Sequence, residues 1–375
     1  MHKKNFLMLL FAFVALGAIA NISCSDHRRD AIKIGVIMPL TGDAAQYGIP
    51  SLNAIQLAVM QTNSEREKWQ PEIKLVPEDD KAQAAQAVSA FQKLVTLEKV
   101  NLILGPLVSS ATLSVAPLAD SNKVVLFTPS SSAPALTTAG DYVFRNELSD
   151  LFGGTSQAEL AVNKLGYKKM ACVYINNDYG AGLFKVFKDK FQALGGQLIF
   201  EDSFGQSNSD FRSMITKLKS ISPDAVFIIS HDEIINFVRQ MVELGAKFQI
   251  YTTPVFEDNR NIEKLGALAE GIIYTYYGNF DPASSNEKIR LFITQYEMQY
   301  KETPTYYAAL AYDAACIALE ALKRNSYNVE SIKDELYRIQ KFPGITGETS
   351  FDVNGDVSKP VSLKTVQNGR FVFLQ

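Results

Sequence analysis

The chain has 375 residues, a formal net charge of −3 at pH 7 and 47% hydrophobic residues. This length suffices for two domains with proper cores, and the composition is that of an ordinary soluble globular protein. A mildly acidic chain without a basic run is a poor binder of nucleic acids, so that class of partner is excluded.

The first residues have the pattern of an export signal. Met1–Lys4 is a basic head, and Phe6–Ala20 is apolar and uncharged but too short to span a bilayer. Residues 1–23 are therefore predicted to be a signal peptide.

Cys24 follows directly, in Asn21-Ile22-Ser23-Cys24. This resembles a bacterial lipobox, in which the cysteine is lipidated and becomes the new N-terminus, although Asn21 stands where a large apolar residue is usual. Residues 24–30 would then be a lipid-anchored tether. Ala18-Ile19-Ala20 also offers a site for ordinary signal peptidase, which would leave a freely soluble product. Both routes predict an extracytoplasmic or periplasmic protein.

The first half of the remaining chain alternates short apolar runs with amphipathic helical patterns. Strands are expected over 32–40, 72–76, 102–104 and 124–128, and helices over 53–62 and 84–95. No hairpin signal separates these segments. The alternation predicts a parallel sheet with helices on both faces.

The same alternation begins again after Asn146. Helices are expected over 151–165, 180–194, 210–220 and 234–244, and strands over 170–175, 198–201, 224–229, 249–252 and 271–276. Three further helices (286–300, 306–323 and 329–339) precede a tail in which Asn368-Gly369 favours a β-hairpin. No linker of distinct composition divides the halves, which indicates lobes joined by short crossing segments.

Two serine clusters each follow an apolar strand at the start of a predicted helix. The first is Ser109 with Ser110, and the second is Ser130, Ser131 and Ser132. The first amides of a helix lack intrahelical acceptors and carry the positive end of the dipole, so a carboxylate is held there by amides and hydroxyls together. In open α/β sheets, ligands bind beyond the carboxyl ends of the strands. The alternative is that each serine is only a helix N-cap.

Catalytic and metal-binding patterns are scarce. His231 is the one histidine beyond the predicted tether, and the chain has no G-x-S-x-G elbow and no phosphate-binding loop. Asp352–Asp356 has the outline of a calcium loop, but Leu363 stands where the closing glutamate belongs. We therefore expect no catalytic residue, no metal site, no cofactor and no enzyme.

Several short motifs, in this order, resemble one known family. They are Ala45–Gly48, Gly105-Pro106 before Ser109-Ser110, Thr128–Pro134, Asp178–Gly182 and Gly344–Gly347 leading to Phe351–Asp356. From Ile32 to the C-terminus, the chain resembles the type I periplasmic solute-binding proteins of ABC transporters, most closely the leucine/isoleucine/valine-binding group.

The resemblance implies an α/β fold with two Rossmann-like lobes joined by a three-segment hinge and closing on a ligand. The N-terminal lobe would comprise residues 31–148 and 278–350, and the C-terminal lobe residues 149–277 and 351–375.

The resemblance also implies a binding site. Ser109, Ser130 and Ser132, with their neighbours Ser110 and Ser131, take the positions that bind the carboxylate and ammonium of an α-amino acid. Tyr47 matches the gate residue of the first lobe, and Tyr179 matches a residue of the second lobe that covers the ligand.

The chain departs from the family where the ammonium would bind. Pro254 stands at the position of the family's second-lobe glutamate, and Glu257 or Asp258 would substitute for it only if the loop shifts. Around the tyrosine that also contacts the ammonium, the chain has Ser230-His231-Asp232. The ligand need not be leucine, or even an α-amino acid.

These observations predict a solute-binding protein that captures a branched-chain or other aliphatic amino acid and delivers it to an ABC permease. We expect a monomer held at a membrane by its lipid anchor, with no nucleic-acid partner. A ligand-sensing lipoprotein and a binder of an amide or another small carboxylate are the alternatives. Sugar binding is disfavoured because the single tryptophan, Trp69, lies in a polar segment.

Overall fold

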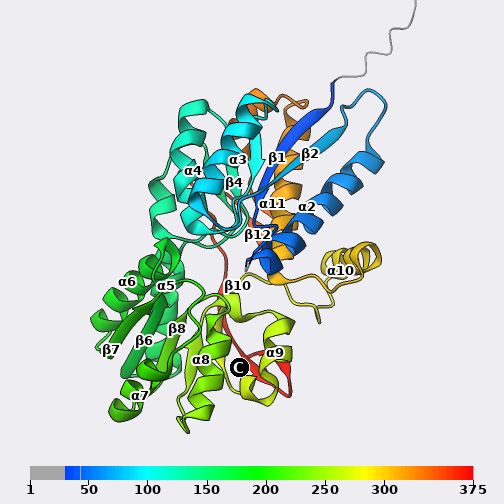
Figure 1. The fold of residues 1–375 in the computed structure, drawn as a ribbon. Coiled ribbons are helices and arrows are strands. Elements are labelled where there is room, and N and C mark those ends of the chain that lie inside the picture. Colours follow the sequence, from blue (N-terminus) through cyan, green and yellow to red (C-terminus); the bar gives the residue numbers. More distant parts are fainter. Residues whose placement is uncertain (1–29, 43, 375) are drawn as a thin grey trace, which may run out of the picture.

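The structure is a computed structural model that describes residues 30–42 and 44–374. The predicted signal peptide and Cys24 lie outside this part of the chain. Two α/β lobes stand one above the other, and the chain passes between them in the middle of the molecule (Figure 1). The predicted α/β class is confirmed.

The first lobe is built on a five-stranded sheet in the order β2-β1-β3-β4-β5, in which all neighbouring strands are parallel. The strands are β1 (Ile32–Met38), β2 (Ile73–Asp79), β3 (Leu102–Leu104), β4 (Val125–Thr128) and β5 (Val143–Arg145). The helices are α2 (Ala45–Glu65), α3 (Ala84–Thr96), α4 (Ser109–Asn122), α10 (Glu287–Tyr300), α11 (Tyr306–Arg324) and α12 (Ile332–Tyr337), with short turns η1 (Pro134–Thr138) and η5 (Val329–Ser331).

Both faces of this sheet are buried, and β3 shows why. Leu102 and Leu104 belong to the core under α2 and α11, whereas Ile103 belongs to the core under α3 and α4. Successive side chains of a strand point to opposite faces, so a strand covered on both sides is apolar at every position.

The second lobe holds a seven-stranded sheet in the order β14-β13-β10-β9-β8-β6-β7. Its strands are β6 (Lys169–Ile175), β7 (Gln197–Phe204), β8 (Ala225–Ile229), β9 (Ile250–Thr252), β10 (Ile273–Tyr277), β13 (Val361–Gln367) and β14 (Arg370–Phe373). The sheet is parallel from β7 to β10, and the predicted C-terminal hairpin adds β13 and β14 antiparallel.

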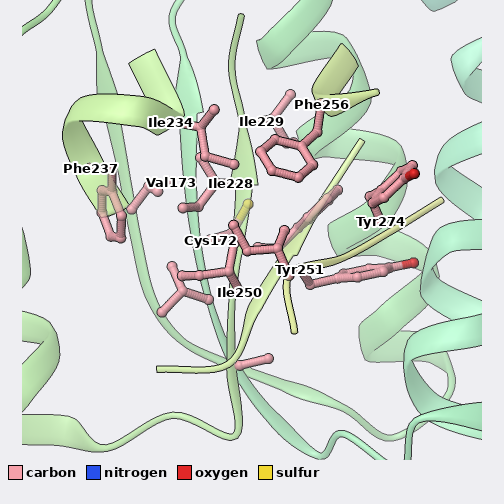
Figure 2. Close-up of a cluster of buried hydrophobic side chains, with 14 of the residues drawn as sticks. Cys172, Val173, Ile228, Ile229, Ile234, Phe237, Ile250, Tyr251, Phe256 and Tyr274 are labelled. Atoms are coloured by element: carbon pink, nitrogen blue, oxygen red, sulfur yellow. The ribbon is translucent and has the colours of Figure 1, made fainter. Parts of the chain in front are cut away.

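Helices again cover the second sheet: α5 (Asp150–Glu159) with the π-turn η2 (Leu160–Lys164), α6 (Asp178–Ala193), α7 (Arg212–Ile221), α8 (Glu233–Glu243) and α9 (Asn259–Leu265), with turns η3 (Pro254–Phe256) and η4 (Gly266–Ala269). Figure 2 shows part of this core: Ile228 and Ile250 of neighbouring strands lie on the side of Phe237 of α8, and the ring of Tyr251 points to the other side of the strands. Cys172 is a buried free thiol in this core.

The chain passes between the sheets three times, after β5, after β10 and between β12 (Gly347–Thr349) and β13. β12 pairs with β11 (Phe342–Gly344) in a small hairpin. Arg145, at the end of β5, forms a buried ion pair of 2.6 Å with Asp356 of the third passage. The residues at which each lobe begins and ends stay a prediction.

Two parts of the fold differ from the sequence-based expectation. Helix α2 begins at Ala45 instead of Asn53, because Gly48 and Pro50 lie inside it where the sequence suggested a loop. A side chain at position 48 would place its Cβ 1.9 Å from the carbonyl oxygen of Pro39, so this helical position requires glycine. Helix α9 and the β11–β12 hairpin were not expected, because short elements carry too little periodicity to be detected.

Candidate functional site

A cavity of about 430 Å³ lies between the two lobes. Its lining comes from the segments that follow each of the strands β1 to β9, together with the end of β10 and the start of α11. Ligands of open parallel sheets bind at this edge because the strand ends release loops and helix N-termini there. Here the edges of two sheets face each other across one cavity.

The structure brings the predicted serines of the first lobe together. Ser109 is the first residue of α4, and its hydroxyl oxygen accepts hydrogen bonds from the amides of Ser132 (3.3 Å) and Ala133 (3.2 Å). The hydroxyl of Ser130 donates to the carbonyl oxygen of Leu107 at 2.9 Å. Ser109, Ser130 and Ser132 all line the cavity.

The other two predicted serines are not among the residues that line it. Ser131 is fully buried, and its hydroxyl lies 2.7 Å from the hydroxyl of Thr112 and donates to the carbonyl of Leu107 at 3.1 Å. Ser110 is half-buried and belongs to the same first turn as Ser109. The hydroxyl of Ser131 thus helps to hold the serine segment, residues Ser130–Ser132, in place, and Ser110 lies outside the cavity wall.

Tyr47 and Tyr179 take equivalent places in the two lobes. Each lies in the first turns of the helix that follows the first strand of its lobe, and a glycine follows each one. The Tyr179 hydroxyl lies 3.0 Å from that of Thr253, and its ring stacks on His231 at 5.5 Å. The Tyr47 ring packs edge-on against Tyr307 at 4.9 Å. Both tyrosines line the cavity.

Among the cavity residues that the sequence reasoning missed are two carboxylates in the segment after β5. Glu147 and Asp150 follow β5 and are 5% and 1% exposed. Glu147 accepts hydrogen bonds from the Tyr306 hydroxyl (2.9 Å) and from the Leu148 amide (2.8 Å), and Asp150 accepts one from the Ser132 hydroxyl (2.9 Å). Both residues lie just beyond the end of a strand, and this position is the sequence signal by which they could have been found.

Burial raises the pKa of both carboxyl groups to about 7, because a charged carboxylate loses its hydration there. Hydrogen bonds from Leu148 and Tyr306 to Glu147, and from Ser132 to Asp150, oppose the shift without cancelling it. Near pH 7 the charged and neutral forms of each group are therefore close in free energy.

Arg145 holds the serine segment in place. Its guanidinium pairs with Asp356 through two hydrogen bonds of 2.6 and 2.7 Å and also donates to the carbonyl oxygens of Ser132 (3.1 Å) and Ala133 (3.0 Å). The fixed fork of a guanidinium suits such a set of acceptors. The wall of the cavity is in this way tied to the third passage between the lobes.

Glu257, one of the predicted ligand-binding residues, lies elsewhere. Its buried carboxylate forms an ion pair with Lys364 of β13 and accepts a hydrogen bond of 2.8 Å from the Tyr274 hydroxyl. Burial raises the pKa of Glu257, and the charge of Lys364 opposes the shift. Glu257 is not among the cavity residues, whereas Pro254 is. The ion pair with Lys364 thus holds Glu257 away from the cavity wall.

Contacts across the cavity hold the two lobes together. The carboxylate of Asp232 in the second lobe accepts hydrogen bonds from the Gln46 amide and the Tyr47 hydroxyl of the first. Arg260 donates to the carbonyl oxygen of Gln46 at 2.7 Å. Pro50, four residues further along the same helix, has no N–H to donate to that carbonyl oxygen.

Burial lowers the pKa of His231, which keeps its ring neutral, although Asp232 and Glu233 oppose the shift. Within residues 30–42 and 44–374, no cluster of His, Cys, Asp and Glu is suited to hold a metal ion. No helix in this same part of the chain is long and apolar enough to cross a bilayer.

Similar proteins share both sequence and fold with this chain. The Leu/Ile/Val-binding protein of Citrobacter freundii is 27% identical over 261 residues, which is 69% of this chain and 71% of that protein. The leucine-, isoleucine-, valine-, threonine-, and alanine-binding protein of Pseudomonas aeruginosa is 25% identical and covers 94% of this chain and 93% of its own.

Among solved structures, the leucine-binding protein LivK from Thermotoga maritima superimposes with a TM-score of 0.84 at 31% identity, covering 92% of this chain and 98% of that one. LivJ from Streptococcus pneumoniae, a branched-chain amino acid transporter substrate-binding protein in complex with isoleucine, gives 0.84 at 30% identity, with coverages of 91% and 97%. A family model described as periplasmic binding protein matches residues 31–370, and the chain therefore belongs to the periplasmic binding protein family.

Proposed function

We propose that this protein binds an aliphatic amino acid, with branched-chain amino acids as the first candidates, between its two lobes and delivers it to an ABC permease. Relatives named for leucine, isoleucine and valine support this proposal, and so does the LivJ structure with isoleucine. The protein makes and breaks no bond in this account. The ligand bridges the lobes and stabilises the closed form, which the permease recognises.

The observation that carries the proposal is the position of Ser109. Ser109 lies at the N-terminus of α4, its hydroxyl accepts hydrogen bonds from the amides of Ser132 and Ala133, and Ser130 and Ser132 line the cavity with it. Helix amides without intrahelical acceptors and adjacent hydroxyls form a site for a carboxylate. Such charge-assisted hydrogen bonds gain strength away from bulk water.

Isothermal calorimetry with leucine, isoleucine and valine tests the proposal. Wild-type protein should bind at least one of them, and Ser109→Ala should weaken binding by more than tenfold, because a hydrogen bond to a charged group contributes roughly 1.5–3 kcal/mol. Ser110→Ala is the matched control in the same helical turn and should leave the affinity unchanged. Equal affinities of all three proteins would remove the serine site, and no response to any amino acid would overturn the proposed ligand class.

The proposal extends to location and assembly. We infer that residues 1–23 are removed, that Cys24 carries a lipid anchor and that the protein works as an extracytoplasmic monomer. The basic head, the short apolar core and the lipobox-like segment support export and lipidation. Cell fractionation of the full chain and of Cys24→Ser tests this: the wild type should be found with membranes and the variant should not.

A further inference from the structure

Glu147 and Asp150 are buried in the cavity without a partner of opposite charge. In the described part of the chain neither carboxylate forms an ion pair, and a single hydrogen bond, from Ser132, reaches the side chain of Asp150. An ionised carboxylate can accept about four hydrogen bonds. A buried charge is normally paired, so an unpaired one that lines a ligand cavity indicates a missing cation.

The nearest arginine cannot supply that cation. Arg145 affects Asp150 electrostatically, but its guanidinium is committed to Asp356, to two carbonyl oxygens and to the hydroxyl of Thr137. Its charge is neutralised by the ion pair with Asp356 at 2.6 Å. Asp150 therefore keeps an excess negative charge whenever it is ionised.

The nearest lysine is shared with another acid. Lys359 is buried and interacts electrostatically with both Asp313 and Glu147, while its amino group donates to the hydroxyl of Thr346 at 2.9 Å. One ammonium does not neutralise two carboxylates. The buried carboxylates near the passages between the lobes, Glu147, Asp150 and Asp313, therefore outnumber the cations that are available to them.

The other basic side chains of the cavity belong to the opposite lobe and do not fill the gap. Lys264 lies 3.8 Å from the carboxylate of Asp232, and burial keeps the ring of His231 neutral. The phenols of Tyr179 and Tyr277 also line the cavity, and their pKa values are raised by burial and by the charges of Asp150 and Glu147. Neutral aromatic rings beside carboxylates suit an ammonium group.

We propose that Asp150, assisted by Glu147, binds the ammonium group of the ligand at the first passage between the lobes, so that the site selects molecules carrying both a carboxylate and an ammonium. This inference rests on the proposed function and adds to it an acid at the first passage. The second-lobe acids that line the cavity are engaged otherwise, since Asp232 accepts hydrogen bonds from the side chains of Gln46 and Tyr47, and Glu233 accepts them from the amides of Ser207 and His231. The Ser132 hydroxyl, bound to Asp150 at 2.9 Å, places this acid beside the serine cluster. That proximity suits the two charged groups on the α-carbon of an amino acid.

Three ligands that differ by one group separate the two ends of the site: leucine, 4-methylpentanoate, which lacks the ammonium, and 3-methylbutylamine, which lacks the carboxylate. Calorimetry should show that Asp150→Asn weakens leucine binding by about 30-fold, the effect of losing one strong charged contact. Binding of 4-methylpentanoate should be unchanged or stronger, because the repulsive charge is gone. Ser109→Ala should weaken both leucine and 4-methylpentanoate.

Asp178→Asn is the matched control, since Asp178 is the exposed first residue of α6 as Asp150 is the buried first residue of α5. It should bind leucine like the wild type. The proposal is overturned if leucine binds the wild type and both Asp150→Asn and Glu147→Gln change its affinity less than threefold. If the wild type binds no amino acid, the proposed function fails. Binding of 3-methylbutylamine that depends on Asp150 would in that case still support an ammonium site at Asp150 and Glu147. If 3-methylbutylamine does not bind either, the ammonium site is overturned together with the proposed function.

Proton release gives a second readout that a purely structural role would not produce. An ammonium beside Asp150 and Glu147 favours their charged forms, so binding at pH 7 should expel protons. Calorimetry of leucine binding in buffers of different ionisation enthalpy measures their number. Wild type should release protons and Asp150→Asn should release fewer, whereas equal numbers in the two proteins would contradict the assignment.

Discussion

The ion pair between Arg145 and Asp356 offers a stringent test of how the lobes are joined. The two side chains are almost fully buried and share two hydrogen bonds of 2.6 and 2.7 Å. Asp356→Asn keeps the shape of the side chain but removes its charge. The guanidinium of Arg145 is then a buried cation held only by neutral acceptors, among them the carbonyl oxygens of Ser132 and Ala133.

The expected loss of stability is large because the partner charge remains buried. Breaking one side of a buried ion pair costs about 3–5 kcal/mol, most of it the desolvation of the charge left behind. The neutral hydrogen bonds to Ser132 and Ala133 keep the cost from rising further. With a dependence on urea of about 3 kcal/mol per molar, the midpoint of unfolding should fall by roughly 1 M.

Circular dichroism during urea unfolding measures this shift. Asp189→Asn is the control, because Asp189 forms an exposed pair with Lys185 at 3.0 Å, and exposed pairs contribute about 0–1 kcal/mol. A loss for Asp356→Asn no larger than that of the control would show that the Arg145 charge is not buried and paired as described. The third passage between the lobes would then not be held by this ion pair.

Two further predictions concern backbone contact and pH. Gly48→Ala should destabilise the protein by about 1–3 kcal/mol, since the new Cβ would lie 1.9 Å from the carbonyl oxygen of Pro39, whereas Gly205→Ala, with nothing within 4 Å, should be nearly neutral in the same urea assay. In the absence of ligand, stability should fall as pH rises from about 4 to about 7. Burial raises the pKa values of Glu147 and Asp150 to about 7, so the folded chain binds protons more tightly than the unfolded one. Over this pH range, the free energy of unfolding of the wild type should fall by up to about 4 kcal/mol relative to that of Asp150→Asn, which lacks this titration; thermal denaturation measures both. The absence of a pH-dependent difference between the two proteins would refute the burial of this charge.

The local pattern of the sequence determined the class of fold and indicated which serines follow the ends of its strands. Continuous apolar runs such as Leu102–Leu104 indicate strands buried on both faces, and serines directly after them indicate helix N-termini at a sheet edge. These signals are local, because the strand, its end and the first turn of the helix are neighbours in the chain. Ser109 and Ser132 could therefore be placed beside one cavity before the structure was known.

The tertiary structure alone decided which acids face that cavity. Glu257 pairs with Lys364, a residue 107 positions away, and so leaves the site for which its sequence neighbourhood made it a candidate. Asp150 meets Ser132, and Asp232 meets Tyr47 across the two lobes. The pKa of a carboxylate and its availability to a ligand depend on burial and on partners from distant segments. Neither produces a recognisable pattern in the sequence.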